Sequence, residues 1–281
     1  MRCALPGKTI ALRILLAAAS AAAGWAAPAT AQANGDKVWL EVSGYSPSIE
    51  TRARIDSATD GSLGTEIGFE SDLNFDDEQV LPAVLAGLRL GSRFSLTAEY
   101  FSLDRSSTVR LQRDITFGDV TYPVAASVAG DFKTDIYRLA VNYAVIRRAT
   151  FDAGVSAGVH ATDVEVSIEG DGRVGGAAAQ FERRTQSLLA PLPTVGVFAN
   201  ARVMPDLVLA GRVDYFSLSV GRYDATLLNA QIAATYRIHR NIGLGIGYRH
   251  VEYKVIAAGE HLVGRVDYNF DGPNLFVRMG F

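Results

Sequence analysis

Apolar and polar residues alternate along most of the chain after residue 38, with the period of two that a β-strand imposes on its side chains. In the segment FSLTAEY, residues 94–100, Phe, Leu, Ala and Tyr alternate with Ser, Thr and Glu. The same alternation recurs at 151–159 and 242–248, and the 3.6-residue period of a helix is not sustained anywhere after residue 38. The pattern therefore predicts an all-β protein whose strands have one apolar and one polar face.

Ten strands are predicted from this alternation, near residues 38–55, 79–90, 94–104, 132–146, 151–168, 187–203, 207–218, 225–238, 241–255 and 261–281. Their connections alternate between tight turns (GSR, IRRAT, MPD and HR) and longer stretches, around 56–78, 105–131, 169–186, 219–224 and 256–260. Short turns at one end and long loops at the other are typical of an antiparallel up-and-down transmembrane β-barrel. An eight-strand barrel remains compatible with the pattern.

Two kinds of irregularity interrupt the alternation. Proline cannot donate a ladder hydrogen bond and a closed barrel has no free edge, so we expect Pro82, Pro191 and Pro193 at or above the outer ends of their strands. The apolar face changes sides around residues 46–48 and again around 270–273. A β-bulge is one cause of such a change, and we interpret both places as bulges.

The aromatic residues of the apolar face fall into two groups. Tyr100, Tyr137, Tyr215 and Tyr248 lie roughly seven to ten residues from the nearest short turn, whereas Phe94, Phe151, Tyr236 and Phe281 lie close to these turns. Two belts of aromatic rings separated by the thickness of a bilayer are typical of proteins anchored at both membrane interfaces. The spacing favours a membrane barrel over a soluble sandwich or barrel.

The chain ends on NLFVRMGF, in which Phe281 follows three apolar residues spaced two apart, Leu275, Val277 and Met279. This ending resembles the closing strand of the outer-membrane β-barrel proteins of Gram-negative bacteria. The resemblance implies location in the cell outer membrane, contact with its lipid and lipopolysaccharide, and recognition of the last strand by the barrel assembly machinery. It implies little about activity.

The first 33 residues have the composition of a secretory signal peptide, with basic residues before the run ILLAAASAAAGWAA and small residues at its end. We expect cleavage after Ala33, which leaves a barrel domain at 34–281. The single cysteine, Cys3, lies in the removed part. Three of the 27 basic residues and none of the 30 acidic ones lie there, so the remainder carries 24 against 30, a balance of −6 that argues against a nucleic-acid partner.

If the apolar face meets lipid, the polar face lines the lumen. Its charged members in this register are eight arginines and five carboxylates: Arg89, Arg138, Arg202, Arg212, Arg237, Arg249, Arg265, Arg278, Glu41, Glu99, Asp152, Asp214 and Asp267. We expect the inward glycines to leave room for arginines lying across the lumen, at positions 154, 158, 196, 243, 245 and 247. The lumen is then either a packed salt-bridge plug or a narrow, weakly anion-preferring pore.

The loop at 56–78 holds eight acidic residues and no basic one. It is compatible with a solvated loop, with a divalent-cation or lipopolysaccharide-bridging patch, or with a surface adhesion role. Within it, DLNFDDE has Asp77 where a calcium loop needs glycine.

The chain also resembles outer-membrane lipid A deacylases in being a small barrel, with Ser217, Thr226, His250 and Glu252 near the outer rim. The His-x-Ser spacing of that family is absent. We therefore predict a structural or limited-permeability barrel that is not an enzyme, with a lipid A-modifying hydrolase or an adhesion barrel as alternatives and no cofactor or metal implied.

Overall fold

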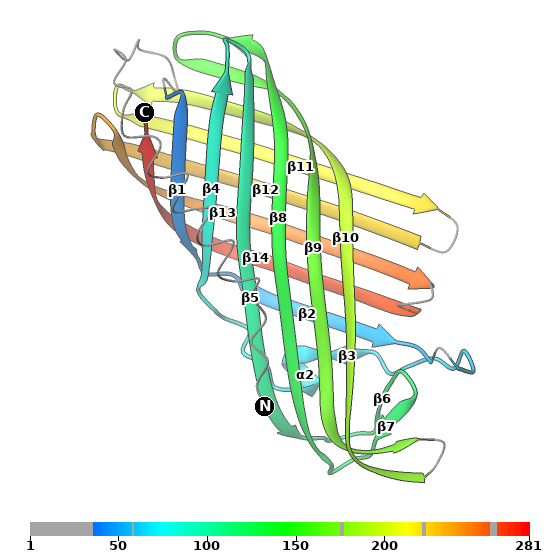
Figure 1. Cartoon of the computed structure of the whole chain (residues 1–281). Helices are drawn as coiled ribbons and strands as arrows, with labels where there is room; N and C mark the ends of the chain where they lie inside the picture. Colours follow the sequence, from blue (N-terminus) through cyan, green and yellow to red (C-terminus); the bar gives the residue numbers. More distant parts are fainter. Residues whose placement is uncertain (1–35, 58, 175–176, 221–222, 259–262) are drawn as a thin grey trace, which may run out of the picture.

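The structure, a computed structural model, describes residues 36–57, 59–174, 177–220, 223–258 and 263–281. It is almost entirely β (Figure 1). The elements in chain order are β1 (Val38–Tyr45), β2 (Ser48–Ile55), β3 (Ile67–Gly68), α2 (Phe69–Asp72), β4 (Leu81–Leu90), β5 (Phe94–Arg110), β6 (Ile115–Phe117), β7 (Val120–Tyr122), β8 (Ser127–Arg147), β9 (Phe151–Val174), β10 (Ala177–Met204), β11 (Leu207–Val220), β12 (Tyr223–His239), β13 (Ile242–Ala258) and β14 (Val263–Gly280). No described helix is long and apolar enough to cross a membrane.

Ten of these strands close into an antiparallel barrel in the order β1, β4, β5, β8, β9, β10, β11, β12, β13 and β14, and β14 pairs with β1. The ten-strand barrel predicted from the sequence is confirmed. The two ends of the described chain close it, because the Phe281 amide donates to the Val38 carbonyl at 2.9 Å and the Val38 amide donates to the Phe281 carbonyl at 3.0 Å. The last residue is therefore held by main-chain hydrogen bonds to β1.

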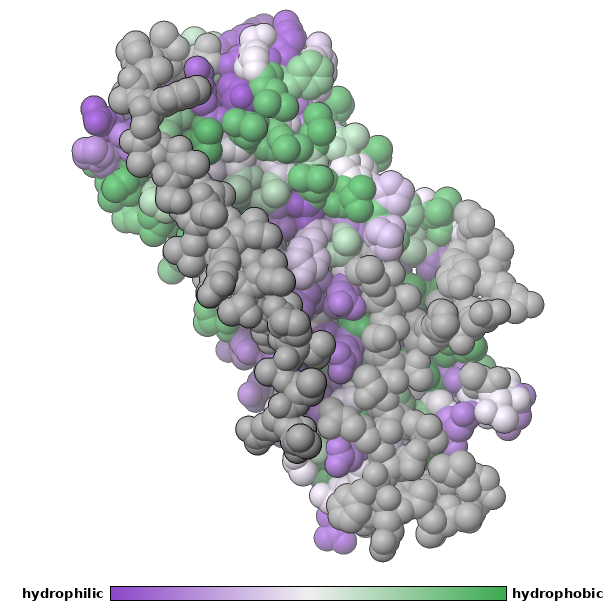
Figure 2. Space-filling model, in the orientation of Figure 1, coloured by the Kyte–Doolittle hydropathy of each residue, from purple (hydrophilic) through white to green (hydrophobic). Residues whose placement is uncertain are grey.

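The two halves of the barrel place their apolar side chains on opposite faces. In the half with the short turns, apolar side chains point outward, so Leu275 is 64% exposed and Ile232 is 68% exposed. In the half with the long loops they fill the interior, where Phe132 and Phe270 are fully buried. Hydrophobic residues gather accordingly on the surface of the end that holds the C terminus (Figure 2). Lipid outside the first half and water outside the second explain the inversion.

This inversion replaces the two predicted bulges. The pairing of β14 with β1 ends at Tyr45 opposite Asn274, and its pairing with β2 resumes at Ser48 opposite Asp271 in the same register. The pairing of β13 with β14 is also unbroken along its whole length. The bulge interpretation was wrong, because the strand keeps its alternation while its surroundings change from lipid to water.

Two stretches predicted as loops are partly strand. β5 and β8 pair as far as Arg110 opposite Ser127, and β9 and β10 pair as far as Val174 opposite Ala177. These hairpins extend beyond the belt that contains Tyr100 and Tyr137. β6 and β7 form a small hairpin, and β7 pairs with β9. The sequence pattern ended the strands too early because the apolar positions change faces at the membrane boundary.

Above the membrane part, the wall is open between two neighbouring strands. β10 pairs with β11 only from Val195 opposite Tyr215 down to the short turn. Beyond Val195, β10 pairs with β9 alone among the described strands. Pro191 and Pro193 lie on this free edge of β10, where a missing N–H leaves no ladder bond broken. The prolines are thus accommodated by an edge that the closed-barrel expectation did not include.

The acidic loop covers a second gap, between β2 and β5. There the buried Arg105 of β5 donates to Glu70 Oε1 of α2 at 2.6 Å and to Thr51 Oγ1 of β2 at 2.6 Å. Its guanidinium centre lies 5.4 Å from the ring centres of both Phe75 and Phe132. One arginine therefore ties the loop, β2 and β5 together over the hydrophobic interior.

Candidate functional site: an ionic layer and a vestibule in the lumen

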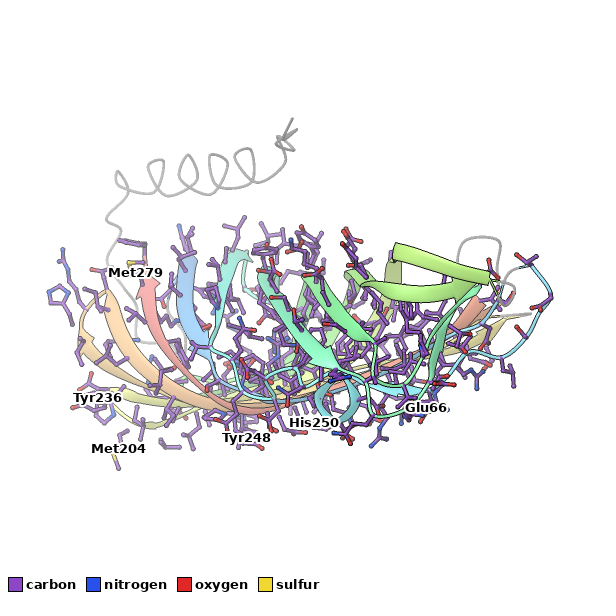
Figure 3. All side chains as sticks on the ribbon, turned by 90° about the horizontal axis from the view of Figure 1, so that it is seen from below. Glu66, Met204, Tyr236, Tyr248, His250 and Met279 are labelled. Carbon is purple, nitrogen blue, oxygen red and sulfur yellow. The ribbon has the colours of Figure 1, made fainter. Side chains whose placement is uncertain are left out.

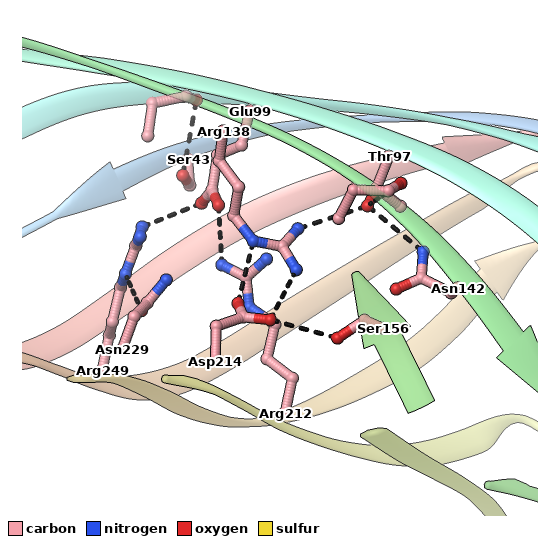
Figure 4. Close-up of polar contacts among 12 residues, drawn as sticks. Ser43, Thr97, Glu99, Arg138, Asn142, Ser156, Arg212, Asp214, Asn229 and Arg249 are labelled. Carbon is pink, nitrogen blue, oxygen red and sulfur yellow. Dashed lines mark hydrogen bonds and ion pairs between the residues drawn. The ribbon is translucent and has the colours of Figure 1, made fainter. Parts of the chain in front are cut away.

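A layer of buried charged side chains crosses the lumen in the membrane half of the barrel (Figure 4). Glu99 of β5 accepts hydrogen bonds from Arg212 Nη2 of β11 at 2.7 Å and from Arg249 Nη1 of β13 at 2.8 Å. Beside it, Arg138 of β8 donates from Nε and Nη2 to the two oxygens of Asp214 of β11, at 2.8 and 3.0 Å. Both carboxylates are almost fully buried.

These ion pairs join strands that are not neighbours in the barrel. Three strands, β8, β9 and β10, separate β5 from β11 in the sheet order. The side chains therefore span the interior, and a buried bidentate pair such as Arg138–Asp214 fixes the distance between two walls. The arrangement is a cross-brace of the barrel.

The layer has polar atoms left over. Among the described residues, Arg249 Nη2, Arg212 Nε, Asn229 Nδ2 and His160 Nδ1 are buried without a hydrogen-bond partner. Buried polar groups are nearly always satisfied, by ordered water where protein groups are lacking. The layer is therefore suited to hold water between its charged groups.

An aromatic layer covers the ionic one on the side of the long loops. The Arg249 guanidinium lies 4.6 Å from the ring centre of Phe101 and 5.8 Å from that of Tyr45. Phe101 contacts Phe270 edge to face, and Phe270 contacts Tyr268 in the same way. These rings belong to the hydrophobic cluster that fills the outer half of the barrel.

On the opposite side of the ionic layer the lumen widens into a cavity of about 200 Å³. We call this cavity the vestibule. Arg138 and Arg212 of the ionic layer line its inner end, and short-turn residues such as Arg93, Asp206 and Arg240 line its mouth.

Of the thirteen charged residues expected in the lumen, eleven lie on the inner face: Arg89, Arg138, Arg202, Arg212, Arg237, Arg249, Arg278, Glu41, Glu99, Asp152 and Asp214. The other two were placed wrongly. Arg265 and Asp267 alternate with buried residues of β14 and share the outer face with the exposed Leu275. They form an ion pair with each other there. The error follows from the supposed bulge at 270–273, which would have moved both residues to the inner face.

The inward glycines make room for different groups than expected. A Cβ at Gly245 would lie 2.0 Å from the Phe276 ring, and a Cβ at Gly247 would lie 2.4 Å from Asn274 Oδ1. A Cβ at Gly196 would come within 2.6 Å of an Asp214 carboxylate oxygen. The expectation that these glycines accommodate long arginines was therefore wrong at Gly245 and Gly247, where they accommodate a ring and an amide from the neighbouring strand.

The structure places the aromatic residues of both groups on the outer face. Tyr137, Tyr215 and Tyr248 are each 48% exposed, and the ring of Tyr100 lies 5.1 Å from that of Tyr137. Tyr236 and Met279 lie near one end of the barrel, Tyr248 and His250 lie near mid-length, and Glu66 lies further toward the other end (Figure 3). Of the proposed assembly signal, Leu275, Val277 and Phe281 are exposed, and Met279 is partly buried.

The rim residues considered for hydrolysis are not assembled into a catalytic group. Ser217 pairs with Thr226, but His250 lies opposite Ala230, four residues further along β12. The His250 Nδ1 atom lies 2.6 Å from Asp271 Oδ1, and Glu252 forms an ion pair with Lys254. Glu252 therefore does not orient His250, and the hydroxyls lie in a different row. The nucleophile, base and orienter arrangement that the hydrolase alternative requires is therefore not assembled from these four residues.

Some of the carboxylates of the acidic loop are held by nearby groups. Arg113 donates to both oxygens of Asp72, at 3.1 and 2.7 Å, and Arg54 binds Asp56 at 2.9 Å. The Ser62 amide, which donates to Asp60, lowers the pKa of that exposed carboxyl to about 2. No described cluster of three His, Cys, Asp or Glu side chains could hold a metal ion.

Comparison with known proteins places the fold. No family model matches the sequence, and no curated protein matches it. Among solved structures, the outer membrane protease OmpT from Escherichia coli is 11% identical, with a TM-score of 0.56 over 87% of this chain and 96% of that one. The transport unit of the autotransporter AIDA-I from Escherichia coli is 10% identical, with a TM-score of 0.40 over 87% and 90% of the two chains. Ail of Yersinia pestis is 8% identical, with a TM-score of 0.33 over 86% and 99%.

The chain therefore has the fold of a small outer-membrane β-barrel, an antiparallel barrel of ten strands closed by the pairing of β14 with β1. OmpT, whose fold it shares, is a protease, but a shared fold carries no activity with it, because function belongs to particular side chains.

Proposed function

We propose that this protein is a sealed, non-catalytic outer-membrane barrel with a structural role. Its membrane half is an anchor, and its outer half presents a rigid platform at the cell surface. In this role the lumen is a packed salt-bridge plug and not a narrow pore.

The ionic layer that braces the barrel lies directly beneath an aromatic core, and this arrangement is the main support for a sealed lumen. Glu99 binds two arginines from the opposite wall, and the rings of Tyr45 and Phe101 cover one of them. An ion that crossed the lumen would have to break these buried pairs and then pass a largely apolar interior, and both steps are costly. The absence of an assembled rim triad among the described residues supports a role without catalysis.

Single-channel recording on the refolded protein in planar bilayers tests the proposal. We expect no stepwise conductance in 1 M KCl, a salt concentration chosen to make small channels visible. Glu99→Gln removes the negative charge that holds Arg212 and Arg249, so we expect brief, small, anion-favouring openings in that variant. Arg265→Ala is the matched control, because it removes an arginine from the outer face of the same barrel.

A steady conductance of the wild-type protein with a reversal potential that shifts toward anions in a salt gradient would establish the pore instead. Folded insertion of every variant is checked by heat-modifiable gel migration, so that silence is not mistaken for failure to insert. The hydrolase alternative has its own readout: a change in lipid A acyl pattern between His250→Ala and wild type, measured by mass spectrometry, would contradict the non-catalytic role.

A further inference from the structure

The vestibule carries more positive than negative charge. Eight of its described lining residues are arginines and four are aspartates or glutamates. Adding Glu99, Asp214 and Arg249 of the ionic layer brings the balance to nine against six. This count includes every described carboxylate of both the cavity and the ionic layer. Arginines therefore exceed carboxylates by three, however the charges are paired within this set.

The excess of positive charge lies toward the mouth of the vestibule. At the inner end Arg138 and Arg212 are bound to Asp214 and Glu99. At the mouth, Arg237 and Arg240 form no ion pair with any carboxylate that the structure describes. Arginines held by protein walls of low dielectric focus a positive potential into a cavity and raise the local concentration of anions.

The volume of the vestibule limits the size of the solute that it can bind. A cavity of about 200 Å³ is smaller than the ~300–1,000 Å³ of typical drug-sized sites, so it suits a small solute. Guanidinium forks match the oxygen pairs of carboxylate and phosphate groups, and an excess of three charges favours a solute with more than one such group. In barrels of this class the short turns face the periplasm.

We propose that the vestibule is a binding site for a small multivalent oxyanion, bearing carboxylate or phosphate groups, that enters from the periplasmic side. The sealed ionic layer forms the floor of the site, so the anion is held and released at the same mouth. This binding goes beyond the structural role proposed above, and it does not require the barrel to conduct.

Trp39 provides a reporter inside the site. It lines the vestibule, is only 9% exposed, and lies with its ring 5.1 Å from the guanidinium centre of Arg278. The chain has one other tryptophan, Trp25, so the full chain with Trp25→Phe fluoresces from Trp39 alone. Quenching of this signal measures which ions enter the vestibule.

The experiment compares iodide, caesium and acrylamide as quenchers of Trp39 in non-ionic detergent at constant ionic strength. Each quenching constant is expressed relative to that of free N-acetyltryptophanamide, because iodide is intrinsically the stronger quencher of indole. On this scale we expect iodide to quench at least about threefold more strongly than caesium, because the cavity concentrates anions. Pyrophosphate and citrate should each compete with iodide, and the stronger competitor identifies phosphate or carboxylate as the preferred group. Equal quenching by iodide and caesium, or no competition by either probe, would overturn the proposal.

Variants locate the effect. Arg237→Ala with Arg240→Ala should lower iodide quenching to about the caesium level, whereas Arg52→Ala, an exposed arginine at the other end, should leave it unchanged. Arg237→Lys keeps the charge and loses the fork, so iodide quenching should persist while pyrophosphate competes less well. Heat-modifiable gel migration checks that each variant is folded. If iodide quenching were the same in the double variant as in the wild type, the proposed site would be refuted. Channel recording tests the sealed barrel and quenching of Trp39 tests the anion site. Either proposal can therefore be refuted while the other stands.

Discussion

Arg105 is expected to hold the acidic loop closed over the gap between β2 and β5. We consider Arg105→Ala. The side chain donates to Glu70 Oε1 at 2.6 Å, to the Asp76 carbonyl at 3.0 Å and to Thr51 Oγ1 at 2.6 Å, and it is buried between two aromatic rings. The substitution removes these contacts together and leaves Glu70 with the Thr51 amide at 2.9 Å as its remaining described partner.

The magnitude follows from the burial. Breaking a fully buried ion pair costs ~3–5 kcal/mol, and the Arg105 side chain is 3% exposed whereas that of Glu70 is 18% exposed. Partial solvation of Glu70 favours the lower end, so we expect about 3 kcal/mol in the free energy of loop closure. Since ~1.4 kcal/mol is a factor of ten, the open state of residues 67–80 should become about 100-fold more populated.

Hydrogen exchange followed by mass spectrometry measures this population in peptides that cover residues 67–80. We expect about 100-fold faster exchange there and little change in β11, β12 or β13. Arg113→Ala is the control, because Arg113 holds Asp72 of the same loop but its side chain is 49% exposed, and exposed pairs contribute ~0–1 kcal/mol. If exchange in Arg105→Ala matched that of Arg113→Ala, packing of the aromatic side chains alone would hold the loop.

Three further outcomes are expected. Phe281→Asp should reduce the folded barrel in the outer membrane, measured by heat-modifiable migration, and an unchanged yield would mean that the terminal ring only packs. Gly245→Val should lower the melting temperature by displacing the Phe276 ring, and the paired change Phe276→Ala should restore part of the loss. Burial raises the pKa of Asp72, but its bonds from Arg113 and the Gly68 amide outweigh burial and lower it overall. Asp72 therefore stabilises the closed loop above the ordinary aspartate pKa of 3.8, and proteolysis within 67–80 should increase as the pH falls below it.

The class of fold, the number of strands and the face on which most lumen charges lie could all be predicted from the alternation of apolar and polar residues. Alternation is a local property, and in the membrane half lipid requires every outward side chain to be apolar. Glu99, Arg138 and Asp214 therefore fall inside whatever the rest of the chain does. The outward tyrosines follow from the same local rule.

Which charged side chains contact each other depends on the closed barrel. Glu99 and Arg249 lie 150 residues apart in sequence, and their contact depends on which walls of a closed barrel face each other. The alternation showed that Arg138 points inward but did not show that Asp214 would bind it. The charge balance of the vestibule likewise depends on the closed barrel, because residues from many strands lie together at its short-turn end.

The tertiary structure also decided where the rule of alternation reverses. The change from lipid to water outside the wall turns the apolar face inward at residues 46–48 and 270–273 without any change of register. A sequence window cannot distinguish this reversal from a bulge, because both move apolar residues from one face to the other. Arg265 and Asp267 were misplaced for this reason, since the height at which a strand leaves the membrane is a property of the assembled barrel and not of the strand.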